Sequence, residues 1–179
     1  QNTARRNTAI GSSALQCNTS GESNSALGYF SLDANTTGSS NVGIAGGLGG
    51  NTTGSGNIGI GSGSLGNNTT CSDNVAVGRS AAQETNSSHG IVAIGAYALC
   101  KNTSGDNNTA VGFCSLVCNV SGGNNTAVGM SALPANTTGG NNAAVGICTM
   151  YSNTEGGSNV AMGRNALKSN TTAALNTAV

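Results

Sequence analysis

The chain has 179 residues with six basic and six acidic side chains, so its formal net charge is zero, and only 7% of its residues are charged. Nucleic acids and anionic membrane surfaces are bound through clustered Lys and Arg, and this balance argues against partners of either kind. No apolar run approaches the roughly 18 residues that a membrane-crossing helix needs, so we expect no membrane span.

A short unit repeats along the whole chain. The units begin at Asn7, Asn24, Asn41, Asn57, Asn74, Ile91, Asn108, Asn125, Asn142, Asn159 and Asn176. Successive starts differ by 17 residues, except for the 16 residues between Asn41 and Asn57. A fixed period of this length indicates a solenoid, in which each unit forms one coil and stacks on the next. We therefore expect residues 1–179 to form a single continuous array with no second domain.

Each unit follows the consensus N-T-A-V/I-G-x-x-A/S-L-x-x-N-T-T/S-G-x-x, with apolar residues at positions four and nine. Position three is always Ala or Gly, which indicates close packing, and position five is Gly in nine of ten full units, as expected at a turn with positive φ. Helices would show apolar spacings of three and four, and recurrent Gly would destabilise them. Short strands between turns fit better. The sequence therefore predicts an all-β fold, a parallel β-solenoid of about ten coils of 17 residues each.

Stacking places equivalent residues in columns along the rod. The asparagines at positions one and twelve are expected to form amide ladders, and the two aliphatic columns to stiffen the rod. At about 4.8 Å per coil, ten coils would extend roughly 48 Å, with open strand edges at both ends. These edges predict self-association into a fibril, end to end. Larger apolar residues at positions six and seven form either a partly buried corner or a strip for lateral contacts: Tyr29, Phe30, Tyr97, Phe113, Met130 and Ile147.

The unit N-T-A-V-G-x-x-A-L, clearest at residues 125–133, resembles the head repeats of YadA-like trimeric autotransporter adhesins. It is also similar to the NTA-x-G repeats of bacteriophage and giant-virus fibre proteins. The resemblance covers the whole chain. It implies a left-handed parallel β-roll with an extracellular structural or adhesive role.

Acceptor sequons for N-linked glycans, N-x-[ST], recur at or next to position twelve. The glycosylation candidates are Asn18, Asn35, Asn51, Asn68, Asn86, Asn102, Asn119, Asn136 and Asn170, with further matches at Asn67, Asn107 and Asn124. The alternative is that N-T-T-G is turn chemistry and carries no sugar. Covalent glycans would place position twelve on the outside of the rod.

Six cysteines in so uniform a chain indicate an oxidising compartment. Cys100 and Cys118 are both assigned to position eleven of consecutive units, so we expect Cα atoms about 5 Å apart and a disulfide between them. Cys114 and Cys118 lack further ligands in register and His89 stands alone, so we expect no metal site.

The sequence offers no constellation for catalysis. The two G-x-G-x-x-G matches, which begin at Gly54 and Gly61, arise from the repeat and open no helix, which argues against nucleotide binding. The few carboxylates are scattered, and a single His89 supports no Ser-His-Asp arrangement. We expect a protein that is not an enzyme and needs no cofactor.

These observations predict a non-enzymatic extracellular structural protein, a segment of a glycosylated β-solenoid fibril. One alternative is a trimeric adhesin or viral fibre segment, in which the small residues at position three or the strip at position six contact two sister chains. Another is an ice-binding solenoid, suggested by the threonine columns.

Overall fold

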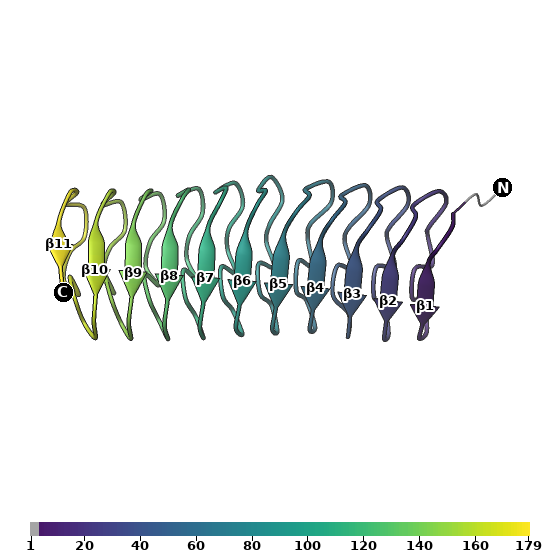
Figure 1. Cartoon of the computed structure of the whole chain (residues 1–179), viewed down its shortest axis with the longest axis horizontal. Helices are drawn as coiled ribbons and strands as arrows, with labels where there is room; N and C mark the ends of the chain where they lie inside the picture. The colour runs from purple at the N-terminus through teal and green to yellow at the C-terminus, as the bar shows by residue number, and fades with distance from the viewer. Residues whose placement is uncertain (1–3) are drawn as a thin grey trace.

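The computed structural model describes residues 4–179 and contains one short strand in each coil. The strands are β1 (Thr8–Ile10), β2 (Ser25–Leu27), β3 (Val42–Ile44), β4 (Ile58–Ile60), β5 (Val75–Val77), β6 (Val92–Ile94), β7 (Thr109–Val111), β8 (Thr126–Val128), β9 (Ala143–Val145), β10 (Val160–Met162) and β11 (Thr177–Ala178). They form a single parallel sheet in chain order, and each strand pairs only with its sequence neighbours (Figure 1). The predicted all-β parallel solenoid is therefore confirmed.

Equivalent positions of successive coils lie side by side. Thr109 pairs with Thr126 in the register of β7 and β8, and the same position-to-position pairing holds along the sheet. The shorter third coil keeps this register, because the backbone N–H of Leu48 donates to the carbonyl of Ser64 at 2.9 Å, as other position-nine residues do. The residue missing from this coil is therefore absorbed in the turn after β3.

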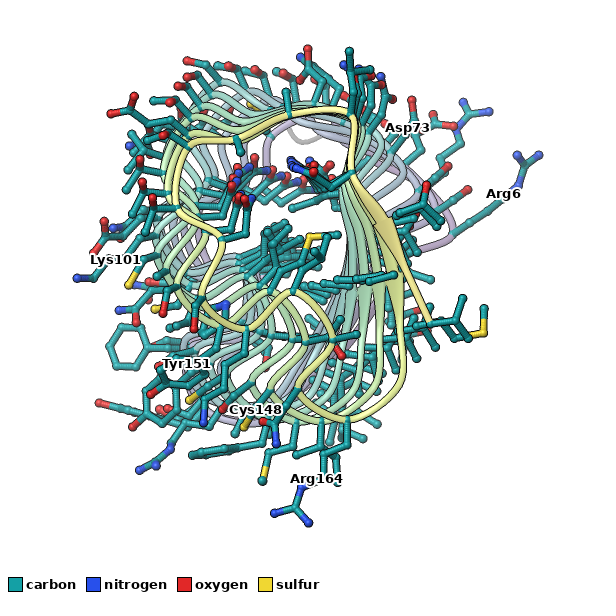
Figure 2. The ribbon with its side chains drawn as sticks, turned by 90° about the vertical axis from the view of Figure 1, so that its left-hand side faces the viewer. Arg6, Asp73, Lys101, Cys148, Tyr151 and Arg164 are labelled. Atoms are coloured by element: carbon teal, nitrogen blue, oxygen red, sulfur yellow. The ribbon has the colours of Figure 1, made fainter. Side chains whose placement is uncertain are left out.

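The apolar core is a column of leucines at position nine packed against the small residues at position three. Leu32, Leu65 and Leu116 are fully buried. A Cβ added to Gly43 would lie 2.9 Å from Cγ of Leu32, so the shorter third coil has room only for Gly at position three, and no coil carries a residue larger than Ala there. The position-nine column, in which Ala82 and Met150 replace leucine, therefore lies in the interior of the solenoid (Figure 2).

The position-four column lies on the outer face of the sheet and not in the core, and its contribution to the stiffness of the rod stays a prediction. Successive side chains of a strand point to opposite faces, and position three points inward. Positions two and four must then point out. Ile10, Leu27 and Met162 at position four are 60%, 48% and 53% exposed.

Several residues of each coil hold the backbone at positive φ, among them those at positions five and nine. Gly112 at position five has φ of 135°, and a Cβ there would meet the carbonyl oxygen of Gly129 on the next coil at 2.5 Å. Glycine is thus required both by the dihedral angle and by the close approach of the coils. Position nine has positive φ as well, with Leu116 at 49°, although it carries a large side chain. Burial of that side chain offsets the local backbone strain.

Candidate functional site

The outer face of the sheet is an uncharged, largely apolar surface, which we call the strand face. It consists of the side chains at positions two and four of β1 to β11. All are Thr, Ser, Ala, Val, Ile, Leu or Met, and most are half-buried or exposed. Contiguous exposed apolar surface of this kind marks interaction sites in soluble proteins. The strands that carry the strand face lie side by side along the length of the rod (Figure 1).

The corner after the strand face carries the larger apolar side chains. Phe113, Met130 and Ile147 at position six are 53%, 49% and 44% exposed. Tyr97 is half-buried, with its ring 6.3 Å from that of Phe113 in an edge-on arrangement and the Arg79 guanidinium 4.8 Å from its centroid. The position-six side chains are thus largely exposed, which is compatible with the contact strip predicted from the sequence.

The asparagines at position twelve form a side-chain ladder inside the solenoid. Nδ2 of Asn119 donates to Oδ1 of Asn102 at 2.7 Å, and Nδ2 of Asn136 donates to Oδ1 of Asn119 at 2.7 Å. The second Nδ2 hydrogen of Asn119 bonds the carbonyl oxygen of Gly122 in the same coil. Figure 2 shows these amide side chains inside the coil, next to the aliphatic core.

The asparagines at position one form a second ladder of a different kind. Here the side-chain Oδ1 accepts the backbone N–H of the equivalent residue in the next coil, as Asn108 does from Asn125 at 2.9 Å. The Nδ2 of Asn125 donates to the carbonyl oxygen of Gly139. The expected amide ladder is therefore confirmed at position twelve, whereas most position-one asparagines bond to backbone groups and not to one another. They satisfy buried polar groups that would otherwise be costly.

The position-twelve ladder is interrupted in the fifth coil, where Thr85 replaces Asn. Oδ1 of Asn68 and Oγ1 of Thr85 are buried and have no hydrogen-bond partner among the described residues. In the following coil, Nδ2 of Asn102 donates to the hydroxyl oxygen of Ser88 at 2.8 Å instead of to an amide oxygen at position twelve. Ser88 stands at position fifteen, where most coils have Gly, so this coil departs from the repeat at two coupled places.

The ladder changes the interpretation of the sequons. Six position-twelve candidates are completely buried: Asn35, Asn51, Asn68, Asn102, Asn119 and Asn136. Asn18 and Asn170 in the end coils are half-buried, and Nδ2 of Asn170 donates to both Asn153 and Ala173. A glycan has no space on such a side chain within the folded coil, so the structure argues against these sites and for the alternative of turn and ladder chemistry. Asn86 is exposed and stays a prediction.

The cysteines are free thiols throughout residues 4–179, which include all six, so the predicted Cys100–Cys118 disulfide is absent. The reason is register. Counted from Ile91 and Asn108, Cys100 is at position ten and Cys118 at position eleven. The backbone N–H of Lys101 donates to the carbonyl oxygen of Val117 at 3.2 Å, so Lys101 is the residue in register with Cys118, and Cys100 is in register with Val117. Burial raises the pKa of the Cys100 thiol, and the Glu84 carboxylate adds to the shift.

An open recess of about 260 Å³ lies between Val117, Cys118, Pro134, Ala135 and Tyr151, none of them charged. Within the described part of the chain, no three His, Cys, Asp or Glu side chains come together as a metal site would require. Nor does that part contain a helix long and apolar enough to cross a membrane.

The imidazole of His89 has a structural contact on the rod surface. Its Nδ1 accepts the backbone N–H of Ser72 at 3.1 Å, while its own backbone N–H donates to the Asp106 carboxylate at 2.8 Å. Serines at the same position in earlier coils make equivalent bonds, for example Ser55 to the N–H of Ser39. His89 therefore continues a column of coil-bridging side chains.

The chain was compared with protein-family models, curated proteins and solved structures, and none of them matches it.

Proposed function

We propose that this chain is a non-enzymatic structural protein, a stiff rod segment of an extracellular fibre that associates with further copies of itself. The observation that carries the proposal is the uncharged strand face, which continues over β1 to β11. The extracellular location follows from the resemblance to adhesin and fibre repeats.

The stiffness of the rod supports a structural role. Backbone hydrogen bonds and the position-nine core column tie each coil to the next, and the two asparagine ladders add further ties except where Thr85 and Ile91 replace asparagine. Threonines at position thirteen add a further tie, since Oγ1 of Thr36 donates to the carbonyl oxygen of Thr52 at 3.0 Å. Because each coil makes the same contacts with its two neighbours, the rod is a one-dimensional stack of equivalent coils. End-to-end stacking would continue the same bonding pattern from one copy to the next.

The strand face supports lateral contacts between copies. A second copy presents columns with the same coil spacing, so its side chains can interdigitate along the full length of the rod. Burial of exposed aliphatic side chains stabilises association by about 25 cal/mol per Å². The occupant we propose for this face is therefore another copy of the chain.

The trimeric adhesin or viral fibre segment is the second candidate, and the same face favours it. Three rods could enclose their strand faces around a common axis. The small residues at position three, one of the contacts first expected, face the inside of each coil and do not take part. The ice-binding alternative loses support, because the position-thirteen hydroxyls, such as that of Thr52, are bonded to the next coil.

The proposal is tested by light scattering and electron microscopy of the purified, unglycosylated chain. We expect masses that are multiples of 17.3 kDa and elongated particles. A variant with Ile94→Lys and Val145→Lys places two charges on the strand face and should shift the mass towards the monomer. The control, Ser104→Lys with Thr138→Lys, alters exposed residues elsewhere on the coil and should not. A wild-type protein that stays monomeric at every concentration would refute self-association.

A further inference from the structure

We propose that N-linked glycans on this protein are confined to the sequons whose asparagine points out of the coil: Asn67, Asn86, and one of the pair Asn107 and Asn124. All four side chains are exposed. The inference rests on the proposed extracellular function, and it replaces a regular glycan column at position twelve by a few sites in the central coils.

The chemistry of the ladder excludes the inward sequons. N-glycosylation replaces one of the two hydrogens on Nδ2. In Asn136 one of these hydrogens bonds Oδ1 of Asn119 at 2.7 Å and the other bonds the carbonyl oxygen of Gly139 at 2.8 Å. A sugar at this atom would break the ladder and would have to fit inside a closed coil. Glycosylation there and the folded solenoid are therefore mutually exclusive.

The outward sequons arise from residues that neighbour the ladders. Asn107 and Asn124 occupy position seventeen, directly before the buried ladder residues Asn108 and Asn125. The hydroxyls of their sequons belong to Thr109 and Thr126, the first residues of β7 and β8.

Asn67 and Asn86 reach the surface on another side of the coil. Asn67 precedes the buried Asn68, and its sequon ends at Thr69. Asn86 is outward because Thr85 takes the inward place at position twelve, so the interruption of the ladder itself creates this site. In Figure 2, Lys101 marks the side of position eleven, where Asn67 stands, and Asp73 marks the corner of position seventeen.

Only one of Asn107 and Asn124 can be occupied in a given chain. They lie on neighbouring coils, about 4.8 Å apart. Nδ2 of Asn107 approaches Oδ1 of Asn124 to 3.5 Å, so the two side chains share one small area of surface. A glycan on either one covers the other.

The modification is a group transfer from a lipid-linked oligosaccharide pyrophosphate, which the secretory pathway supplies. Nδ2 of the asparagine forms a bond to C1 of the first sugar, and the bond between C1 and the pyrophosphate oxygen breaks. The lipid pyrophosphate leaves, and Nδ2 loses one proton. The sequon hydroxyl is required for acceptance by the transferase.

The test is secretion of the whole chain from cultured animal cells, isolation of the folded fraction by size exclusion, and glycopeptide mass spectrometry. We expect sugar on Asn67, on Asn86 and on either Asn107 or Asn124, and none on the six buried asparagines. Sugar on a buried ladder asparagine in folded protein would overturn the inference. So would four bare outward asparagines.

Two matched variants remove one sequon each while keeping a residue that the fold already uses at that position. Thr109→Val and Thr126→Val each remove one sequon and introduce the residue that Val75 and Val92 provide at the same position. The first should move the shared glycan to Asn124 and the second to Asn107. Loss of sugar from both sites in either variant would contradict a shared area. Self-association is measured on unglycosylated protein from bacteria, so failure of one proposal does not imply failure of the other.

Discussion

Asn136 donates a side-chain hydrogen bond of 2.7 Å to Asn119 on the preceding coil, and both side chains are fully buried. Each amide in this column acts at once as donor and acceptor along the rod. The solenoid interior is therefore divided into an apolar half, filled by leucine, and a polar half whose groups satisfy one another. Such a polar half stabilises only while the chain of partners is complete.

Replacement of Asn119 by Leu should destabilise the rod. The substitution leaves Oδ1 of Asn102 without its donor and one Nδ2 hydrogen of Asn136 without its acceptor. We expect a loss of at least about 2 kcal/mol in the free energy of unfolding. For a chain of this size that lowers Tm by about 4–8 °C, which thermal melts followed by circular dichroism would show. The control is Asn67→Ala on the surface, for which we expect a change within about 0.5 kcal/mol. Equal effects from both would contradict the ladder.

Full repair of the ladder in the fifth coil should need two substitutions together. In a regular coil, a Cβ at position fifteen would lie 2.5 Å from the amide oxygen at position twelve, as seen for Gly38 and Asn35. The fourth coil accommodates Cys71 at position fifteen beside Asn68, so Thr85→Asn alone should be tolerated but should gain less stability than the double variant. Thr85→Asn with Ser88→Gly supplies a donor to Oδ1 of Asn68 and should raise stability by about 1–3 kcal/mol. Urea unfolding of the two variants decides the point, and a single variant as stable as the double one would refute the coupling.

Removal of a core leucine should cost far more than removal of an outer one. Leu116→Ala opens a cavity between neighbouring coils, and we expect a loss of about 2–5 kcal/mol. Leu27→Ala removes a side chain that is 48% exposed on the strand face and should change the stability of the monomer little. Urea unfolding compares the two at a protein concentration where the chain is monomeric. Similar losses would place position four in the core after all.

The cysteines should differ in reactivity. Burial raises the pKa of the Cys71 thiol, so at pH 8 a smaller fraction of it is the reactive thiolate. Cys17 is exposed. In timed alkylation with iodoacetamide followed by peptide mass spectrometry, Cys17 should react well before Cys71, and urea should remove the difference. A Cys71 that reacts as fast as Cys17 in the folded protein would contradict its burial.

The repeat period was sufficient to predict the fold, because one coil per unit follows from spacing alone. The direction of each side chain was harder to predict. Strand alternation could have shown that Val111 must face outward once Ala110 faces inward. The frequent pairing of Asn at position twelve with Gly at position fifteen could have indicated an inward amide. The asparagine was instead interpreted as part of a glycosylation sequon. A sequon specifies which sequence the transferase accepts, and not the direction in which the side chain points.

The sequence by itself determined the solenoid, the stacking register and the two asparagine columns, because these depend only on which residue recurs at which interval. The tertiary structure alone decided which columns line the interior. Closure of the coil sets Leu116 and Asn119 inside and Val111 outside, and it places Cys100 beside Val117 instead of Cys118. The direction of each side chain depends on how the backbone turns between columns, including the left-handed conformation of Leu116. The spacing of residues in the sequence does not determine that turn.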